Sequence, residues 1–116
     1  MSAFSDPGIE ISPQDARERI ESGEAQLIDV RESYEWDAGR IAGARHIELE
    51  RLASQAETID RDRPVIFQCR LGSRSAMATQ AFRAAGYDAW SMAGGLQRWA
   101  GEGLPLEPDD GTVADH

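Results

Sequence analysis

The stretch PVIFQCRLGSRSAMATQAF, residues 64–82, decides the fold of this chain. Residues 65–68 form an apolar, partly β-branched run that predicts a short buried strand. Residues 75–85 are rich in alanine, the strongest helix former, and predict a helix. The only cysteine, Cys69, lies in the loop between them. A strand, a loop and a helix in this order predict a parallel α/β unit, in which ligands bind beyond the carboxyl ends of the strands. Cys69 is therefore expected at a binding site.

The same alternation continues on both sides of that stretch. The expected strands span residues 9–11, 27–30, 45–47, 65–68 and 89–92, and the expected helices 12–23, 49–57, 75–85 and 96–101. This pattern predicts an α/β fold with a central, mostly parallel sheet and helices on both faces. Residues 1–107 are expected to form one domain, residues 108–116 an acidic, flexible tail, and the chain to fray from Leu104 onward. Tyr34 and Trp36 are expected in the core.

Length and composition restrict the kind of protein. The 116 residues, 41% of them hydrophobic, suit one globular domain with a modest core. A single cysteine cannot form an internal disulfide, and the first residues show no basic patch followed by an apolar run. No apolar stretch approaches the ~20 residues of a membrane span. These features predict a soluble, cytoplasmic protein.

The net charge and the number of metal-ligating side chains limit the partners and cofactors that the protein is expected to bind. The net charge of −9 argues against nucleic acid or an anionic membrane, because both are negatively charged. An anionic substrate would need a local positive field that overcomes the charge of the whole chain. One cysteine and two histidines in separate segments, His46 and His116, give no metal-ligand cluster, so no metal or other cofactor is expected.

The loop after Cys69 has the composition of an anion-binding loop. A thiol attacks as its thiolate, and a free cysteine has a pKa near ~8.5, so the anion must be stabilised. A tight loop of small residues turns its backbone N–H groups inward, and the positive end of the following helix adds to their effect. Gly72 permits the positive φ that such a loop requires, and the hydroxyls of Ser73 and Ser75 add donors. The sequence therefore predicts a reactive thiolate, although a lone cysteine is often a small buried hydrophobe.

Arg74 is a cation at the expected start of a helix, where it opposes the helix dipole at a cost of roughly 0.3–1 kcal/mol. An anionic substrate in the loop would offset that cost. The alternative is that Arg74 binds a carboxylate of the protein, such as Asp29, and the two interpretations are compatible.

Four segments together resemble the rhodanese-homology domains, the thiosulfate sulfurtransferase family. The loop CRLGSRS, residues 69–75, is similar to the family's active-site loop. The other three segments are LIDVRE (27–32) with YEW (34–36), GRIAGA (39–44), and GGL (94–96) with Trp99 and GLP (103–105). Arg40 stands where the family usually has a histidine, which puts a role for that histidine in doubt here. The four segments follow the family's order over nearly the whole chain.

The resemblance implies a rhodanese-like fold and a sulfur-transfer reaction. Cys69 would attack the outer sulfur of a small anionic donor, thiosulfate or a persulfide, and become a persulfide that passes sulfur to a thiol or cyanide. The implied substrate-binding residues are the rest of the loop, with Arg74 and Arg70 holding the anionic end of the donor. They are Arg70, Leu71, Gly72, Ser73, Arg74 and Ser75. Asp29 and Arg31 would support the site from the neighbouring strand end, or form a structural ion pair.

Three alternatives remain open at this point. Phosphatases and arsenate reductases of the Cdc25 type share the implied fold, but they resemble Cys-x5-Arg, whereas Cys69 and Arg74 form Cys-x4-Arg, a smaller ring that suits sulfur better than phosphate. Some rhodanese-like modules are regulatory and often lack the cysteine. A persulfide carrier, which receives sulfur from a relay protein, would share the chemistry and differ in its donor.

Overall fold

The computed structural model describes residues 8–115, and its core is a five-stranded sheet. The strands are β1 (Glu10–Ile11), β2 (Gln26–Asp29), β3 (Arg45–His46), β4 (Val65–Gln68) and β5 (Ala89–Met92). Their order is β1-β5-β4-β2-β3, and every neighbouring pair is parallel. The predicted α/β class is confirmed, and the sheet is parallel throughout.

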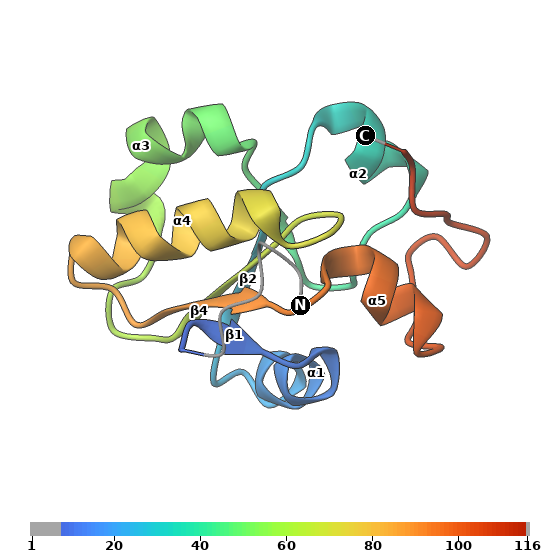
Figure 1. The fold of residues 1–116 in the computed structure, drawn as a ribbon, viewed down its shortest axis with the longest axis horizontal. Helices are drawn as coiled ribbons and strands as arrows, with labels where there is room; N and C mark the ends of the chain where they lie inside the picture. Colours follow the sequence, from blue (N-terminus) through green and yellow to red (C-terminus); the bar gives the residue numbers. More distant parts are fainter. Residues whose placement is uncertain (1–7, 116) are drawn as a thin grey trace.

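Helices cover both faces of this sheet (Figure 1). They are α1 (Pro13–Glu21), α2 (Ser33–Ala38), α3 (Leu52–Gln55), α4 (Ser73–Ala84) and α5 (Gly95–Gly101), with 3-10 turns η1 (Leu49–Arg51) and η2 (Ala56–Thr58) around α3. Figure 1 shows α3 and α4 on one side of the sheet and α1 on the other. Within residues 8–115, no helix is long and apolar enough to cross a membrane.

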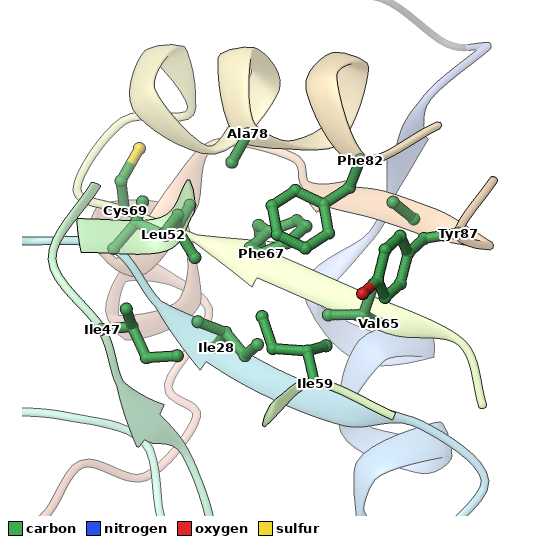
Figure 2. Packing of buried hydrophobic residues seen from close by; sticks show 12 residues of the cluster. Ile28, Ile47, Leu52, Ile59, Val65, Phe67, Cys69, Ala78, Phe82 and Tyr87 are labelled. Carbon is green, nitrogen blue, oxygen red and sulfur yellow. The ribbon is translucent and has the colours of Figure 1, made fainter. Parts of the chain in front are cut away.

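The two faces of the sheet bury separate clusters, because successive side chains of a strand point to opposite sides. Ile28 and Phe67 point toward α3 and α4, where Phe67 meets Phe82 with ring centroids 4.9 Å apart (Figure 2). Leu27 and Ile66 point to the other face, where they join residues of α1 and α5. Buried on both faces, β2 and β4 carry consecutive apolar residues, Leu27 and Ile28 in β2 and residues 65–67 in β4, as strands of parallel sheets do.

Most elements match the sequence prediction within two residues, with two larger differences. Helix α2 was not predicted, and the helix expected over 49–57 is divided into η1, α3 and η2. Of the two aromatic residues of α2, Tyr34 is half exposed, so its expected place in the core is wrong. Trp36 is partly buried and stacks on His46, with ring centroids 4.9 Å apart.

The expected fraying from Leu104 is also wrong for the first residues of that segment. Leu104 is buried, and Leu106 packs against the cluster on the α1 face. The backbone of Glu107 exchanges two hydrogen bonds with Arg40, at 2.7 and 2.9 Å, because the chain folds back beside α2. Further on, the Thr112 N–H donates to the Ala38 carbonyl at 2.8 Å. The flexibility expected for 108–116 stays a prediction.

Candidate active site

Cys69 follows β4 directly, and its sulfur accepts hydrogen bonds from the loop that starts there. The Gly72 N–H donates to Sγ at 3.1 Å and the Ser75 N–H at 3.4 Å, while the Ser75 hydroxyl lies 3.5 Å from Sγ. Figure 2 shows the sulfur on the α4 side of the sheet, toward the first turn of the helix. Cys69 is fully buried, so the sulfur meets polar donors in a site without solvent contact. Such donors stabilise a negative charge on sulfur.

The curl of the loop depends on Gly72 and Ser75. Gly72 has φ +114°, a left-handed conformation that favours glycine, and it lets the chain turn from β4 into α4. The Ser75 hydroxyl lies 3.2 Å from the Gly72 carbonyl and 2.8 Å from the hydroxyl of Ser91 on β5. Ser75 therefore ties the loop to the next strand.

The outer side of the loop is held by the start of α5. The Leu96 N–H donates to the Cys69 carbonyl at 2.8 Å, and the Gln97 N–H donates to the Arg70 carbonyl at 3.1 Å. Gly95 has φ +60°, and a Cβ placed there would clash with the Arg70 carbonyl oxygen. These bonds turn the loop carbonyls away from the sulfur, which leaves its N–H groups facing inward. The sequence placed a turn at Gly94 and Gly95 but did not indicate this contact.

Arg74 forms a two-pronged ion pair with Glu35 of α2. Its Nη1 donates to Oε1 at 2.7 Å and its Nη2 to Oε2 at 3.0 Å. Burial alone would lower the pKa of Arg74, but the hydrogen bonds and charge of Glu35 raise it above its ordinary value, so the guanidinium stays charged. The interpretation that Arg74 binds a carboxylate of the protein is confirmed, but the partner is Glu35 and not Asp29.

Glu35 was missed by the sequence reasoning, although a signal for it exists. Glu32 and Glu35 are three residues apart and form a capping box, in which each side chain accepts a hydrogen bond from the other's backbone N–H at the start of α2. Recognising that spacing would have placed a helix at Ser33 and a fixed carboxylate near the loop.

Asp29 and Arg31 form a separate, fully buried pair. Arg31 Nε lies 2.9 Å from Asp29 Oδ1, and its Nη2 lies 2.8 Å from Oδ2. Gln68, the residue before Cys69, donates to Asp29 Oδ2 at 2.6 Å, and Arg31 Nη2 also donates to the Gly39 carbonyl at 2.8 Å. The pair thus joins the ends of β2 and β4 to the end of α2.

The remaining loop residues differ in exposure. Leu71 is 47% exposed, and Ser73 is the first residue of α4. Arg70 Nη2 lies 3.3 Å from Asp115 Oδ1. The Nε atom of Arg70 is buried and has no hydrogen-bond partner within residues 8–115. Over the same residues, no group of three or more histidine, cysteine or acidic side chains is placed to hold a metal ion.

A hollow of about 300 Å³ opens beside the loop at Arg74, and we refer to it as the loop hollow. Val30 and Leu49 give it apolar walls. Three carboxylates also line it, those of Glu32, Glu48 and Glu50. It lies at the carboxyl ends of the strands, where ligands bind in parallel α/β folds.

The chain belongs to the rhodanese-like domain family, whose model matches residues 12–102. It is 34% identical over 99 residues to the thiosulfate sulfurtransferase GlpE of Actinobacillus succinogenes, covering 84% of this chain and 89% of that protein. It is 40% identical over 79 residues to the uncharacterized protein YqhL of Bacillus subtilis, covering 67% of this chain and 63% of that protein.

The fold agrees with that membership. The crystal structure of a rhodanese-related protein from Thermoplasma volcanium superposes with a TM-score of 0.79 at 31% identity, covering 84% of this chain and 96% of that one. The resemblance and the rhodanese-like fold inferred from four short segments are both confirmed.

Proposed function

We propose that this protein is a sulfurtransferase that carries sulfane sulfur on Cys69. In the first step the Cys69 thiolate attacks the outer sulfur of a donor such as thiosulfate. A Cys69–sulfur bond forms, the sulfur–sulfur bond of the donor breaks, and sulfite leaves with the bonding electron pair. In the second step an acceptor thiolate or cyanide attacks the outer sulfur of the persulfide, and Cys69 departs as a thiolate.

The observation that carries this proposal is the pair of backbone N–H groups aimed at the sulfur, from Gly72 at 3.1 Å and Ser75 at 3.4 Å. Fixed dipoles that already point at a charge need no reorganisation during the reaction, and they act strongly where water is excluded. They suit a thiolate before the first step and a persulfide anion after it. The GlpE relative, named for this activity, supports the same assignment.

The donor's anionic end has two cationic neighbours in this proposal. Arg70 offers the buried Nε that lacks a partner within residues 8–115. Arg74 has N–H groups beyond the two that bind Glu35, since a guanidinium carries five. Asp29 and Arg31 hold β2 against β4 and support the loop without contact with the sulfur in our proposal.

Intact-mass measurement after incubation with thiosulfate tests the proposal. The wild type should gain the mass of one sulfur atom, a reducing thiol should remove it, and Cys69→Ser should gain nothing. Cys69→Ser keeps nearly the same volume, and far-UV circular dichroism verifies that it is folded. A wild type that gains no sulfur from thiosulfate or from a persulfide contradicts the proposal, and rapid release of phosphate from an aryl phosphate would favour a phosphatase instead.

A further inference from the structure

A second hollow, of about 280 Å³, adjoins the loop hollow, with Glu48 in the wall of both. Apart from Glu48 it is mainly basic and polar, and we refer to it as the basic hollow. Its polar lining consists of Ser33, Arg45, His46, Glu48, Arg51 and Gln55. None of these side chains has a role in the proposed sulfur-transfer steps.

The basic hollow lies at the same edge of the sheet as Cys69. His46 ends β3 and pairs with Asp29 of β2, and Asp29 pairs on its other side with Gln68, the residue before Cys69. Neighbouring strands are about 4.8 Å apart, so the backbone ends of β3 and β4 are separated by two strand spacings, about 10 Å. A molecule somewhat larger than thiosulfate can reach both.

The charges of the basic hollow favour an anion. Within residues 8–115, Arg45 binds only neutral oxygens, those of Thr58 at 2.6 and 3.1 Å, and the side chain of Arg51 has no ion-pair partner. His46 Nε2 lies 2.7 Å from the Arg31 carbonyl and donates to it, because a carbonyl only accepts. Against two guanidinium groups stands one lining carboxylate, Glu48, which lies 3.4 Å from the Ser33 hydroxyl.

The loop hollow has the opposite balance. Its one lining cation, Arg74, is paired with Glu35, while three carboxylates stand on its walls. In a chain of net charge −9, the basic hollow is thus the better place near the sulfur for a negatively charged group that is too large to enter the loop.

We propose that the basic hollow binds the anionic group, a carboxylate or phosphate, of a small-molecule thiol acceptor whose sulfur reaches Cys69 through the loop hollow. This inference rests on the proposed function and specifies its acceptor. The acceptor thiolate attacks the outer sulfur of the Cys69 persulfide, a new sulfur–sulfur bond forms on the acceptor, and the bond to Cys69 breaks to leave the thiolate. Thiosulfate and cyanide are too short to contact both hollows.

The test compares matched acceptors in the full chain, with thiosulfate as the donor. N-acetylglutathione is compared with its dimethyl ester, and 4′-phosphopantetheine with pantetheine, so that each pair differs in its anionic groups and keeps its thiol. We expect at least one acid to have a KM several-fold below that of its neutral partner. The pair of acceptors whose KM values differ shows whether the basic hollow prefers a carboxylate or a phosphate.

Arg51→Gln is the main variant, because the Arg51 side chain makes no ion pair within residues 8–115 and its loss should leave the fold intact. It should raise the KM of the preferred acid about threefold to fivefold, the effect of one exposed charge, and leave the KM of the neutral partner unchanged. Glu48→Gln should lower the KM of the acid. Arg63→Gln, an exposed arginine whose Nη2 lies 3.3 Å from the Gly23 carbonyl, is the control.

Equal KM values for acid and neutral acceptors overturn the inference, as does an Arg51→Gln effect that is the same for both. A failure of the sulfurtransferase proposal has another signature, the absence of added sulfur on Cys69. A wild type that acquires the sulfur from thiosulfate and passes it to cyanide, but shows no preference for acids, therefore refutes the acceptor site alone.

Discussion

Besides the exposed Arg70–Asp115 pair, two arginine–carboxylate pairs lie near the loop, Asp29–Arg31 and Glu35–Arg74, and they differ in their surroundings. Both side chains of the first pair are 0% exposed, and Gln68 and the Gly39 carbonyl add hydrogen bonds to it. In the second pair Glu35 is 0% exposed, but Arg74 is 16% exposed and borders the loop hollow. The Asp29–Arg31 pair thus stabilises the fold, whereas the Glu35–Arg74 pair leaves a guanidinium accessible to a ligand.

The largest effect should follow from Asp29→Asn, which leaves the Arg31 guanidinium buried without a carboxylate. Breaking a buried pair on one side costs about 3–5 kcal/mol, because the remaining charge has lost both water and its partner. Urea denaturation should show a loss of unfolding free energy in that range. Glu21→Gln, in the exposed Arg17–Glu21 pair, is the control and should lose about 0.5 kcal/mol or less. Equal losses of unfolding free energy in the two variants would show that the buried pair stabilises the fold no more than an exposed pair does.

Compared with Asp29→Asn, Arg74→Gln should cost less stability and more activity. Water in the loop hollow can occupy the vacated space beside Glu35, so the loss of unfolding free energy should be about 1–3 kcal/mol. The value of kcat/KM for thiosulfate should fall about tenfold, since each 1.4 kcal/mol of lost charge-assisted binding is a factor of ten. Asp29→Asn should show the reverse order, a larger loss of stability and a smaller loss of kcat/KM while folded. An unchanged kcat/KM in Arg74→Gln would remove this arginine from the donor site.

The sequence predicted those parts of the site that depend on neighbouring residues. Residues 65–68 read as a strand because they are apolar on both faces, and the loop after Cys69 reads as an anion site because its residues are small and precede a helix. Helix α4 begins two residues earlier than expected, at Ser73, because Gly72 already turns the chain with φ +114°. The four residues between Cys69 and Arg74 could be counted directly in the sequence.

Contacts between distant segments could not be predicted in this way. Helix α2 has six residues and its N-cap is a glutamate, Glu32, a weaker signal than serine or aspartate, so Glu35 and its bond to Arg74 were missed. The contact of Gly95 with the Arg70 carbonyl joins two loops whose sequences give no sign of each other. The chain after Gly103 was expected to fray because it is acidic and rich in proline. Instead, Leu104 and Leu106 pack against the apolar cluster on the α1 face of the sheet.

The smallest expected effect is a shift in the titration of Tyr34, which reports on the charge of Glu35 beside Arg74. Partial desolvation and the nearby carboxylates of Glu35 and Glu32 raise the pKa of Tyr34 above its ordinary value of about 10, since both disfavour the phenolate. Ultraviolet absorbance titration of the wild type, after subtraction of Tyr34→Phe, should show this raised pKa, with circular dichroism to verify folding at each pH.

Glu35→Gln removes one of those carboxylates and should therefore move the pKa of Tyr34 back toward 10, while Glu21→Gln, in the exposed Arg17–Glu21 pair, should leave it where it is. Arg74 lowers the pKa of Tyr34 in the wild type, and in Glu35→Gln its charge is no longer balanced, which moves the titration in the same direction. A titration that is identical in wild type and Glu35→Gln would mean that Arg74 and Glu35 do not act on Tyr34 as a charged pair, and the contrast with Asp29–Arg31 would lose its electrostatic basis.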